Sequence, residues 1–176
     1  MRTFALGKVY QLIEPGPVVL LTTSHRGIPN VMAMSWHMMV EFTPPQIACI
    51  VSNRNHSFKA LRRSKECVIA IPPAEFLKTV VAIGNCSGAD TDKFATLGIA
   101  TKPARHVAAP LLPDCIANLE CRVIDTRMVN AYCMFILEVV QAWIDPKRRD
   151  AKTVHHQGWG KFVLDGRTIT LPSDKA

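Results

Sequence analysis

The sequence predicts a mainly β fold, an antiparallel barrel with a few short helices, on two observations. Short apolar runs rich in β-branched residues recur along the chain, and turns rich in Gly, Pro, Asn and Asp separate them. Helical spacing of apolar residues is confined to two or three short segments. Successive strands joined by turns pair as antiparallel neighbours and can close into a barrel. We expect one domain over residues 1–176, without repeats or linkers.

Four strands are expected in the first half of the chain. Residues 18–23 form a continuous apolar, β-branched run, which indicates a strand buried on both faces. The stretch from Asn30 to Ser57 contains two strands joined at Pro44–Pro45, and the second of them covers residues 46–51. The fourth strand covers residues 66–71.

Helices are predicted from apolar spacing together with start and stop signals. Proline suits the first helical turn, Asp and Thr suit the cap before it, and glycine suits the position after the last turn. A weak helix is expected over residues 6–13 and a second helix over residues 58–63. A third starts at Pro72–Pro73, buries Phe76, Val80 and Ile83 and stops at Gly84. A fourth follows the caps Asp90, Thr91 and Asp92 and stops at Gly98.

The second half begins with an irregular, Pro-rich segment over residues 99–114. Residues 117–123 then alternate between apolar and polar side chains, which predicts a half-buried strand with Asn118, Glu120 and Arg122 on its exposed face.

Two further features complete the expected order. A loop over residues 125–131 leads into a long apolar strand over residues 132–144. The dipeptide Asp165–Gly166 is a strong signal for a two-residue hairpin, which would join residues 162–164 to residues 168–171.

The composition is that of a soluble globular protein. Hydrophobic residues make up 48% of the 176 residues and charged residues 20%, which argues against disorder. No apolar run approaches the roughly 20 residues that a membrane-spanning helix needs, and no signal peptide is apparent. The six cysteines include no C-x-x-C pair, so we expect free thiols, no structural zinc and a cytoplasmic location.

The net charge of +7 has two readings. The basic clusters at residues 62–65 and 147–152 either form a solvated face or attract an anionic partner, such as a dinucleotide or an acidic redox protein. No basic strand interleaved with aromatic residues is present, so we do not expect nucleic-acid binding.

One stretch of the sequence carries a binding hypothesis. The polar turn Ser52–Ser57 contains Arg54 and leads directly into a predicted helix, whose first N–H groups have no partners within the helix. A helix N-terminus next to a cation is suited to a phosphate group. A planar aromatic ligand can lie against Trp36 while its phosphate lies on this turn. The stretch therefore predicts FMN binding.

The ordered set of motifs resembles the flavin reductase-like, FMN-binding split-barrel family, which includes flavoredoxins and the reductase components of two-component monooxygenases. The resemblance extends from Pro17 to about Val140. Its landmarks are residues 17–23, residues 30–36, Pro44–Pro45, Ser52-Asn53-Arg54 with Ser57, the helix at Pro72–Pro73, Ser87-Gly88 with Asp92-Lys93-Phe94, and Leu119-Glu120-Cys121.

The resemblance implies a homodimer of Greek-key split barrels that hold FMN near the subunit interface. It implies three groups of cofactor-binding residues. These are Asn30, Ser35 and Trp36 at the ring and ribityl chain, Ser52, Asn53, Arg54 and Ser57 around the phosphate at the first helix start, and Ser87 and Lys93 at a second helix N-terminus.

The chain departs from the family at one position. Many relatives carry Gly-Asp-His before the late strand, where this chain has Asn130-Ala131-Tyr132. Tyr132, expected near the flavin or nicotinamide, keeps an aromatic ring and an O–H but cannot become a cation. No catalytic side chain is assigned, because the hydride chemistry belongs to the flavin.

Two functions follow from the resemblance. As an enzyme, the protein would oxidise NAD(P)H through FMN and reduce a free flavin or another acceptor. As a carrier of the flavoredoxin type, it would hold FMN permanently and exchange electrons with a protein partner. A pyridoxal-phosphate or haem-binding barrel of similar shape is a third alternative.

Two aromatic clusters near the end of the chain have more than one possible role. His155 and His156 are adjacent, so on a strand they point to opposite faces and do not suit one metal ion; they are expected on the surface or at the rim of the flavin. Trp159 and Phe162 either cover the flavin ring or pack at the end of the barrel.

Overall fold

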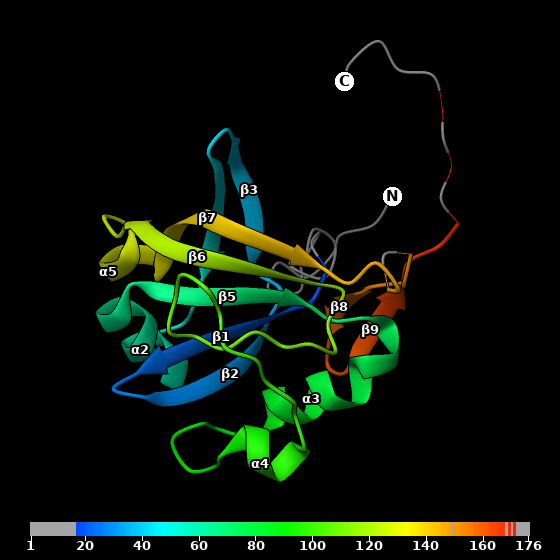
Figure 1. Ribbon diagram of the computed structural model, residues 1–176, viewed down its shortest axis with the longest axis horizontal. Coiled ribbons are helices and arrows are strands. Elements are labelled where there is room, and N and C mark those ends of the chain that lie inside the picture. The colour runs from blue at the N-terminus through cyan, green and yellow to red at the C-terminus, as the bar shows by residue number, and fades with distance from the viewer. Residues whose placement is uncertain (1–16, 149, 168, 170, 172–176) are drawn as a thin grey trace, which may run out of the picture.

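The structure is a computed structural model, and it describes residues 17–148, 150–167, 169 and 171. Its main part is an antiparallel sheet of seven strands in the order β2-β1-β5-β6-β7-β4-β3, which curls into a split barrel (Figure 1). The predicted helix over residues 6–13 lies outside the described residues. The strands of this sheet are β1 (Val19–His25), β2 (Ile28–Met34), β3 (His37–Phe42), β4 (Pro45–Ile50), β5 (Glu66–Ile71), β6 (Ala117–Asp125) and β7 (Met134–Ile144).

The long strand predicted from Asn30 to Pro44 is wrong, because the chain leaves the sheet at Ser35 and Trp36. Before this break, β2 pairs with β1 at one edge of the sheet. After it, β3 pairs with β4 at the other edge. The two edge strands, β2 and β3, are consecutive in sequence, so the chain crosses the open side of the barrel between them.

β1 lies between two hydrophobic cores, which explains its continuous apolar run. Val19 and Leu21 belong to the core that α2 (His56–Ser64) covers through Phe58 and Leu61. Leu20, on the opposite face, belongs to the core beneath α3 (Leu77–Asn85). Each fully buried leucine contributes roughly 1.5–3 kcal/mol relative to an exposed one.

The two helices that follow β5 form close to their predicted positions. A short 3₁₀ turn, η2 (Ala74–Phe76), follows the two prolines and leads into α3, which buries Val80 and Ile83. Gly84 does not end this helix, because α3 continues to Asn85. The short helix α4 (Lys93–Leu97) is capped by Asp92 and ends at Gly98, whose φ of 64° is left-handed.

The polar face predicted for β6 is wrong at two positions. Asn118 and Glu120 are buried, because the irregular segment that precedes the strand folds back over them. Asn118 exchanges hydrogen bonds with the backbone N–H and C=O of Leu112, at 2.8 and 3.0 Å. Glu120 accepts hydrogen bonds from the backbone N–H groups of Arg105 (3.0 Å) and His106 (2.6 Å).

Before β7, the predicted loop contains a turn of helix, α5 (Val129–Tyr132). The strand expected from Tyr132 therefore begins two residues later, at Met134. Tyr132 lies at the end of α5 rather than on the sheet.

The hairpin predicted at Asp165–Gly166 does not form among the described residues, since residues 165–167, 169 and 171 are not in a strand. β9 (Lys161–Leu164) pairs with β8 (Val154–Gly158), and the turn between them contains Trp159 and Gly160. Both turn residues have positive φ, 52° and 73°, as a two-residue hairpin of type I′ requires. Asp165 instead accepts hydrogen bonds from the N–H and O–H of Thr153 (2.8 and 2.6 Å).

All six cysteines are free thiols, and four of them are buried. None of the helices in the described part of the chain is long and apolar enough to cross a membrane. Among the described residues, no three His, Cys, Asp or Glu side chains are grouped to hold a metal ion.

Replacing Glu120 with Gln should lower the free energy of unfolding by about 2 kcal/mol near neutral pH. A glutamine accepts through one oxygen only, whereas Glu120 serves Arg105, His106 and, at 2.8 Å, the indole N–H of Trp143. Burial alone raises the pKa of Glu120, but the hydrogen bonds from Arg105, Trp143 and His106 outweigh it and hold that pKa below its ordinary value.

The pH dependence of this effect follows from the lowered pKa. The ionised carboxylate stabilises the fold above the pKa of the unfolded chain, about 4.3, and this stabilisation is lost as the pH falls through the folded pKa. Urea unfolding should therefore show a gap between wild type and Glu120→Gln at neutral pH that narrows below about pH 4. The exposed Asp90→Asn is the control, and an equal loss of stability there would contradict the prediction.

Candidate functional site

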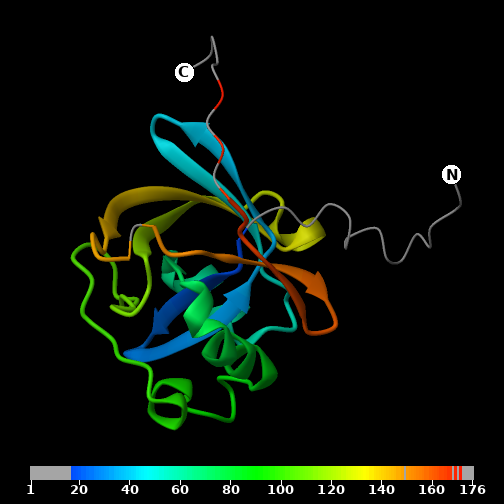
Figure 2. The same ribbon diagram turned by 90° about the vertical axis from the view of Figure 1, so that its right-hand side faces the viewer.

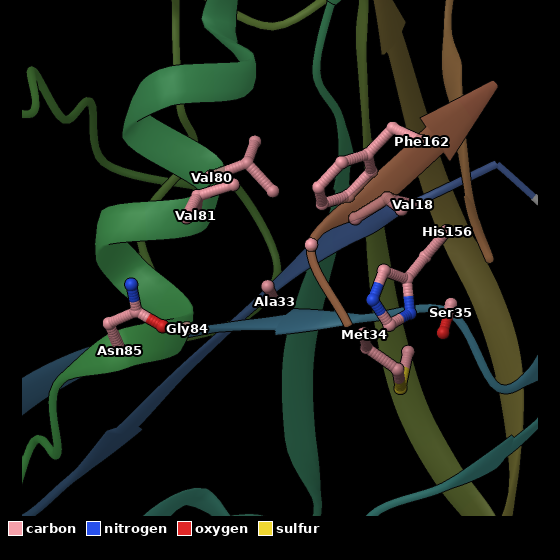
Figure 3. A pocket seen from close by; sticks show the side chains of 11 residues that line it. Val18, Ala33, Met34, Ser35, Val80, Val81, Gly84, Asn85, His156 and Phe162 are labelled. Carbon is pink, nitrogen blue, oxygen red and sulfur yellow. The ribbon is translucent and has the colours of Figure 1, made fainter. Parts of the chain in front are cut away.

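Two cavities adjoin along β2 and α3. One, of about 370 Å³, lies at the start of α2, and we call it the polar end. The other, of about 230 Å³, lies between α3 and the β8–β9 hairpin, and we call it the ring end (Figure 3). Ala33, Gly84 and Asn85 line both cavities, so the two form one groove.

The polar end contains the open N-terminus of α2. Asn55 precedes the helix in an extended conformation, but its side chain makes no capping hydrogen bond. No acidic residue occupies the first turn, so neither a side-chain cap nor a carboxylate satisfies its N–H groups. The exposed Arg54 and His56 line the cavity beside it. This arrangement attracts an anion, because the helix dipole and the guanidinium act in the same direction.

A buried contact fixes the helix start against the sheet. The amide of Asn30 on β2 donates a hydrogen bond to the hydroxyl of Ser57 in the first turn of α2, at 2.8 Å. Gly88 packs on the other side of Asn30, where an added Cβ would lie 2.0 Å from the amide oxygen. No side chain fits there, so this position requires glycine. Three segments are thereby held together at the polar end.

Lys93 lies at the polar end, but not as predicted. Its side chain is buried, with 4% exposed, and its ammonium donates to the carbonyl oxygen of Ile83 in the last turn of α3, at 2.8 Å. Burial lowers the pKa of Lys93. The N-terminus of α4 is capped, because the carboxylate of Asp92 accepts hydrogen bonds from the backbone N–H groups of Phe94 and Ala95, so those two N–H groups are already paired.

The ring end is a slot with mainly apolar walls. Val80 and Val81 of α3 face Phe162 of β9 across the cavity, and Met34 of β2 lies at its floor (Figure 3). The polar groups are few, namely Ser35, Asn85 and His156. The His156 ring packs on the Phe162 ring with centroids 5.1 Å apart. A flat, mostly apolar ligand with a polar edge suits such a slot.

The groove gathers most of the predicted site residues. Asn30, Arg54, Ser57, Ser87 and Lys93 line the polar end, and Ser35 lines the ring end.

Four predicted residues lie outside both cavities. Ser52 accepts a hydrogen bond from the backbone N–H of Arg54 (3.3 Å) and so shapes the turn. Asn53 lines a separate cavity on the other side of α2. Trp36 and Tyr132 are 53% and 61% exposed and line neither end of the groove.

Sequence reasoning did not assign three residues that line the groove. Asn85 ends a helix that was expected to stop one residue earlier. His56 lies within the polar turn Ser52–Ser57, and its side chain lines the polar end. His156 lies far along the chain, and the sequence left it, together with His155, as a histidine of the surface or of the flavin rim.

A family model described as the flavin reductase like domain matches residues 13–161 of the chain. The chain belongs to this family. The resemblance found in the motifs is therefore confirmed, and the split-barrel fold agrees with it.

The family includes relatives of similar length. The uncharacterized protein YddH of Escherichia coli K12 is 32% identical over 176 residues, which cover 91% of this chain and 92% of that one. The FMN-binding domain of a flavin reductases-like enzyme from Shewanella baltica OS155 superposes with a TM-score of 0.84, at 26% identity and 97% coverage of both chains. The flavoredoxin of Desulfovibrio vulgaris (Miyazaki F) shares the fold, with a TM-score of 0.81, 24% identity and coverage of 99% of this chain and 96% of that one.

Within this flavin reductase-like domain, the groove separates two kinds of chemistry. The polar end offers N–H groups, hydroxyls and a guanidinium. The ring end offers apolar walls with a few polar groups. A ligand with a phosphate at one end and a flat ring at the other satisfies both, which is the general shape of a flavin mononucleotide.

Proposed function

We propose that this protein binds FMN in the groove, with the phosphate at the polar end and the isoalloxazine at the ring end. The observation that carries the proposal is the open N-terminus of α2 next to an apolar slot. Arg54, Ser57 and Ser87 would hold the phosphate, and Asn30 would keep Ser57 in place. Val80 and Phe162 would flank the ring. The name of the S. baltica relative, an FMN-binding domain, supports this assignment.

The residues at the polar end suit a phosphomonoester in particular. A dianion needs several donors and a cation, and the helix start, Ser57 and Arg54 supply them without a competing carboxylate. Lys93 would add positive charge from within the wall, since its ammonium has two further donors besides the one given to Ile83. A ligand without a phosphate would leave this end unmatched.

We further propose an enzymatic role, the oxidation of NAD(P)H with reduction of a free flavin or another acceptor. Bound FMN supplies a ring that accepts hydride and releases electrons singly or in pairs. The chain would orient the ring between α3 and β9, where the apolar walls would limit the access of water to the ring. The name of the S. baltica relative, a flavin reductases-like enzyme, supports this role. The net charge of +7 favours the approach of an anionic dinucleotide.

An electron carrier is the second candidate function. In that case a redox protein partner, rather than NAD(P)H, would reduce the flavin. Tyr132, which stands where many relatives have a histidine, is exposed and cannot supply a cation to a nicotinamide. The six free thiols are consistent with action in the cytoplasm, where we place the protein in either case.

We also propose that a second copy of the chain covers β3. Large apolar side chains are exposed along this strand, which extends beyond the body of the barrel in both views (Figures 1 and 2). Phe42 is 83% exposed, and Met38, Met39 and Val40 accompany it. Soluble monomers rarely leave so large an apolar patch in water. A homodimer would bury it next to Trp36, which follows Ser35 of the ring end in the sequence.

Arg54→Ala should weaken FMN binding about tenfold and leave riboflavin binding unchanged, because riboflavin lacks the phosphate. About 31 heavy atoms at roughly 0.3 kcal/mol each give FMN a dissociation constant in the sub-micromolar range, which flavin fluorescence titration measures. Arg62→Ala, an exposed arginine of α2 that does not line the groove, is the matched control. Equal losses for both flavins would place Arg54 away from the phosphate.

The enzyme and carrier functions differ in the electron donor. We expect the FMN-loaded protein to oxidise NADH or NADPH when free flavin is added, measured as the loss of absorbance of the reduced nicotinamide. A carrier would purify with its flavin bound and would be reduced by a protein donor but by neither nicotinamide. Absence of nicotinamide oxidation with every acceptor would exclude the enzymatic role and leave FMN binding intact.

Phe42→Asp should shift the protein from dimer to monomer, because a charged side chain cannot be buried in an apolar interface without a partner. Light scattering after size-exclusion chromatography measures the mass of each species. Ile28→Asp, at an exposed apolar position on the opposite edge of the sheet, is the control and should leave the mass unchanged. A wild-type mass of a single chain would refute the dimer.

A further inference from the structure

His156 is the only ionisable side chain among the described residues that line the ring end. The other polar groups there, Ser35 and Asn85, are a hydroxyl and an amide and carry no charge. Figure 3 shows the His156 ring projecting from the hairpin side into the cavity, opposite the end of α3. Among the described residues, this imidazole is the one group at the ring end that can accept a proton and become positively charged.

The position of His156 is fixed by the strand on which it lies. Val154, two residues earlier on the same face of β8, is fully buried in the core beneath α3. Its carbonyl oxygen accepts a hydrogen bond from the backbone N–H of Val18, at 2.7 Å, which ties β8 to the start of β1. His156 follows on that face and therefore points along α3 into the cavity. Phe162, its cross-strand partner, packs against the ring.

The neighbouring histidine has a different environment. His155 points to the other face of β8, where its Nε2 lies 3.0 Å from the carboxylate of Asp165. Asp165 keeps two further hydrogen bonds from Thr153. The two imidazoles therefore occupy opposite faces of one strand, and only His156 lines the groove.

We propose that His156 is a charge-compensating residue for the bound flavin, an inference that rests on the proposed FMN binding. Addition of a hydride brings two electrons and one proton to the neutral oxidised ring and leaves it with one negative charge. The imidazolium of His156 balances that charge, and where the imidazole starts neutral it takes one proton from solvent. His156 thereby stabilises the reduced flavin over the oxidised one and raises the reduction potential of the couple.

Other charged groups lie farther along the groove or face away. Arg54, His56 and Lys93 line the polar end, where the phosphate is expected, together with the thiol of Cys86. Lys161 is exposed at the start of β9. None of these side chains lines the ring end, so in the part of the chain that the structure describes His156 is the ionisable group nearest to the proposed ring position.

The test compares three variants at one pH, about 6. His156→Phe keeps an aromatic ring against Phe162, and His156→Gln keeps a hydrogen-bond donor; both remove the charge. His155→Phe is the matched control on the opposite face of β8. For each protein, the midpoint potential of bound FMN is measured against a reference dye, and the affinity for oxidised FMN is measured by titration.

We expect both His156 variants to bind oxidised FMN and to lose about tenfold in affinity for reduced relative to oxidised flavin. That ratio corresponds to a potential about 30 mV lower for a two-electron couple. The His155→Phe potential should equal that of wild type.

Several results would overturn the proposal. Unchanged potentials in the His156 variants would refute charge compensation while FMN binding stands. A wild-type potential in His156→Gln alone would show that a hydrogen bond, not a charge, is involved. An equal shift in His155→Phe would assign the effect to the hairpin as a whole. If His156→Phe fails to fold, His156→Gln decides, and if the wild type does not bind FMN, the proposed function fails first.

Discussion

The hydrogen bond between Asn30 and Ser57 is the contact on which the groove depends. It joins an edge strand of the sheet to the first turn of α2, two elements that 27 positions of sequence separate. Both partners are buried, so loss of either side chain would leave the other as an unsatisfied polar group. The requirement for glycine at position 88 follows from the same contact, because the loop after α3 packs directly on Asn30.

This contact determines where positive potential appears in the groove. It holds the α2 N-terminus open toward the cavity, whereas the N-terminus of α4 is closed by its own aspartate. The C-terminal turn of α3, where a helix dipole is negative, would repel an anion at the same place. Lys93 offsets that negative potential, because its ammonium donates a hydrogen bond to the carbonyl oxygen of Ile83. The positive charge of Lys93 therefore acts from a buried position behind the cavity surface and not from the protein surface.

Local patterns in the sequence predicted the elements that depend on local chemistry. β1, β4, β5 and α2 formed close to the expected bounds, because continuous apolar runs and a polar turn before a helix act over a few residues. The break at Ser35 and Trp36 was not predictable in this way, since the apolar run continues through it. What interrupts the strand is closure of the sheet, which sends the chain from one edge to the other.

The sequence pattern predicted neither the burial of Glu120 nor the hairpin at Trp159, because both depend on contacts with distant segments. A carboxylate on the polar face of an alternating strand looks exposed until a distant loop supplies its donors. Asp165–Gly166 has the residues of a tight turn, but Asp165 already binds Thr153, which aligns β9 with β8 instead.

The residues that line the groove also divide into those that local sequence determines and those that depend on distant contacts. The polar turn that holds Arg54 and Ser57 is local and lines the groove, whereas His156 reaches the ring end only because β8 docks on β1 through Val154.

The positions of Trp36 and Tyr132 connect the groove to the exposed strand. Both are aromatic, both were expected at the flavin, and in one chain both face solvent. Trp36 lies between Ser35, which lines the ring end, and β3, whose apolar side chains are exposed. If a second chain covers β3, the indole becomes part of the interface at the mouth of the slot. On this arrangement one chain supplies the phosphate site and the slot, and assembly supplies the aromatic wall on its open side.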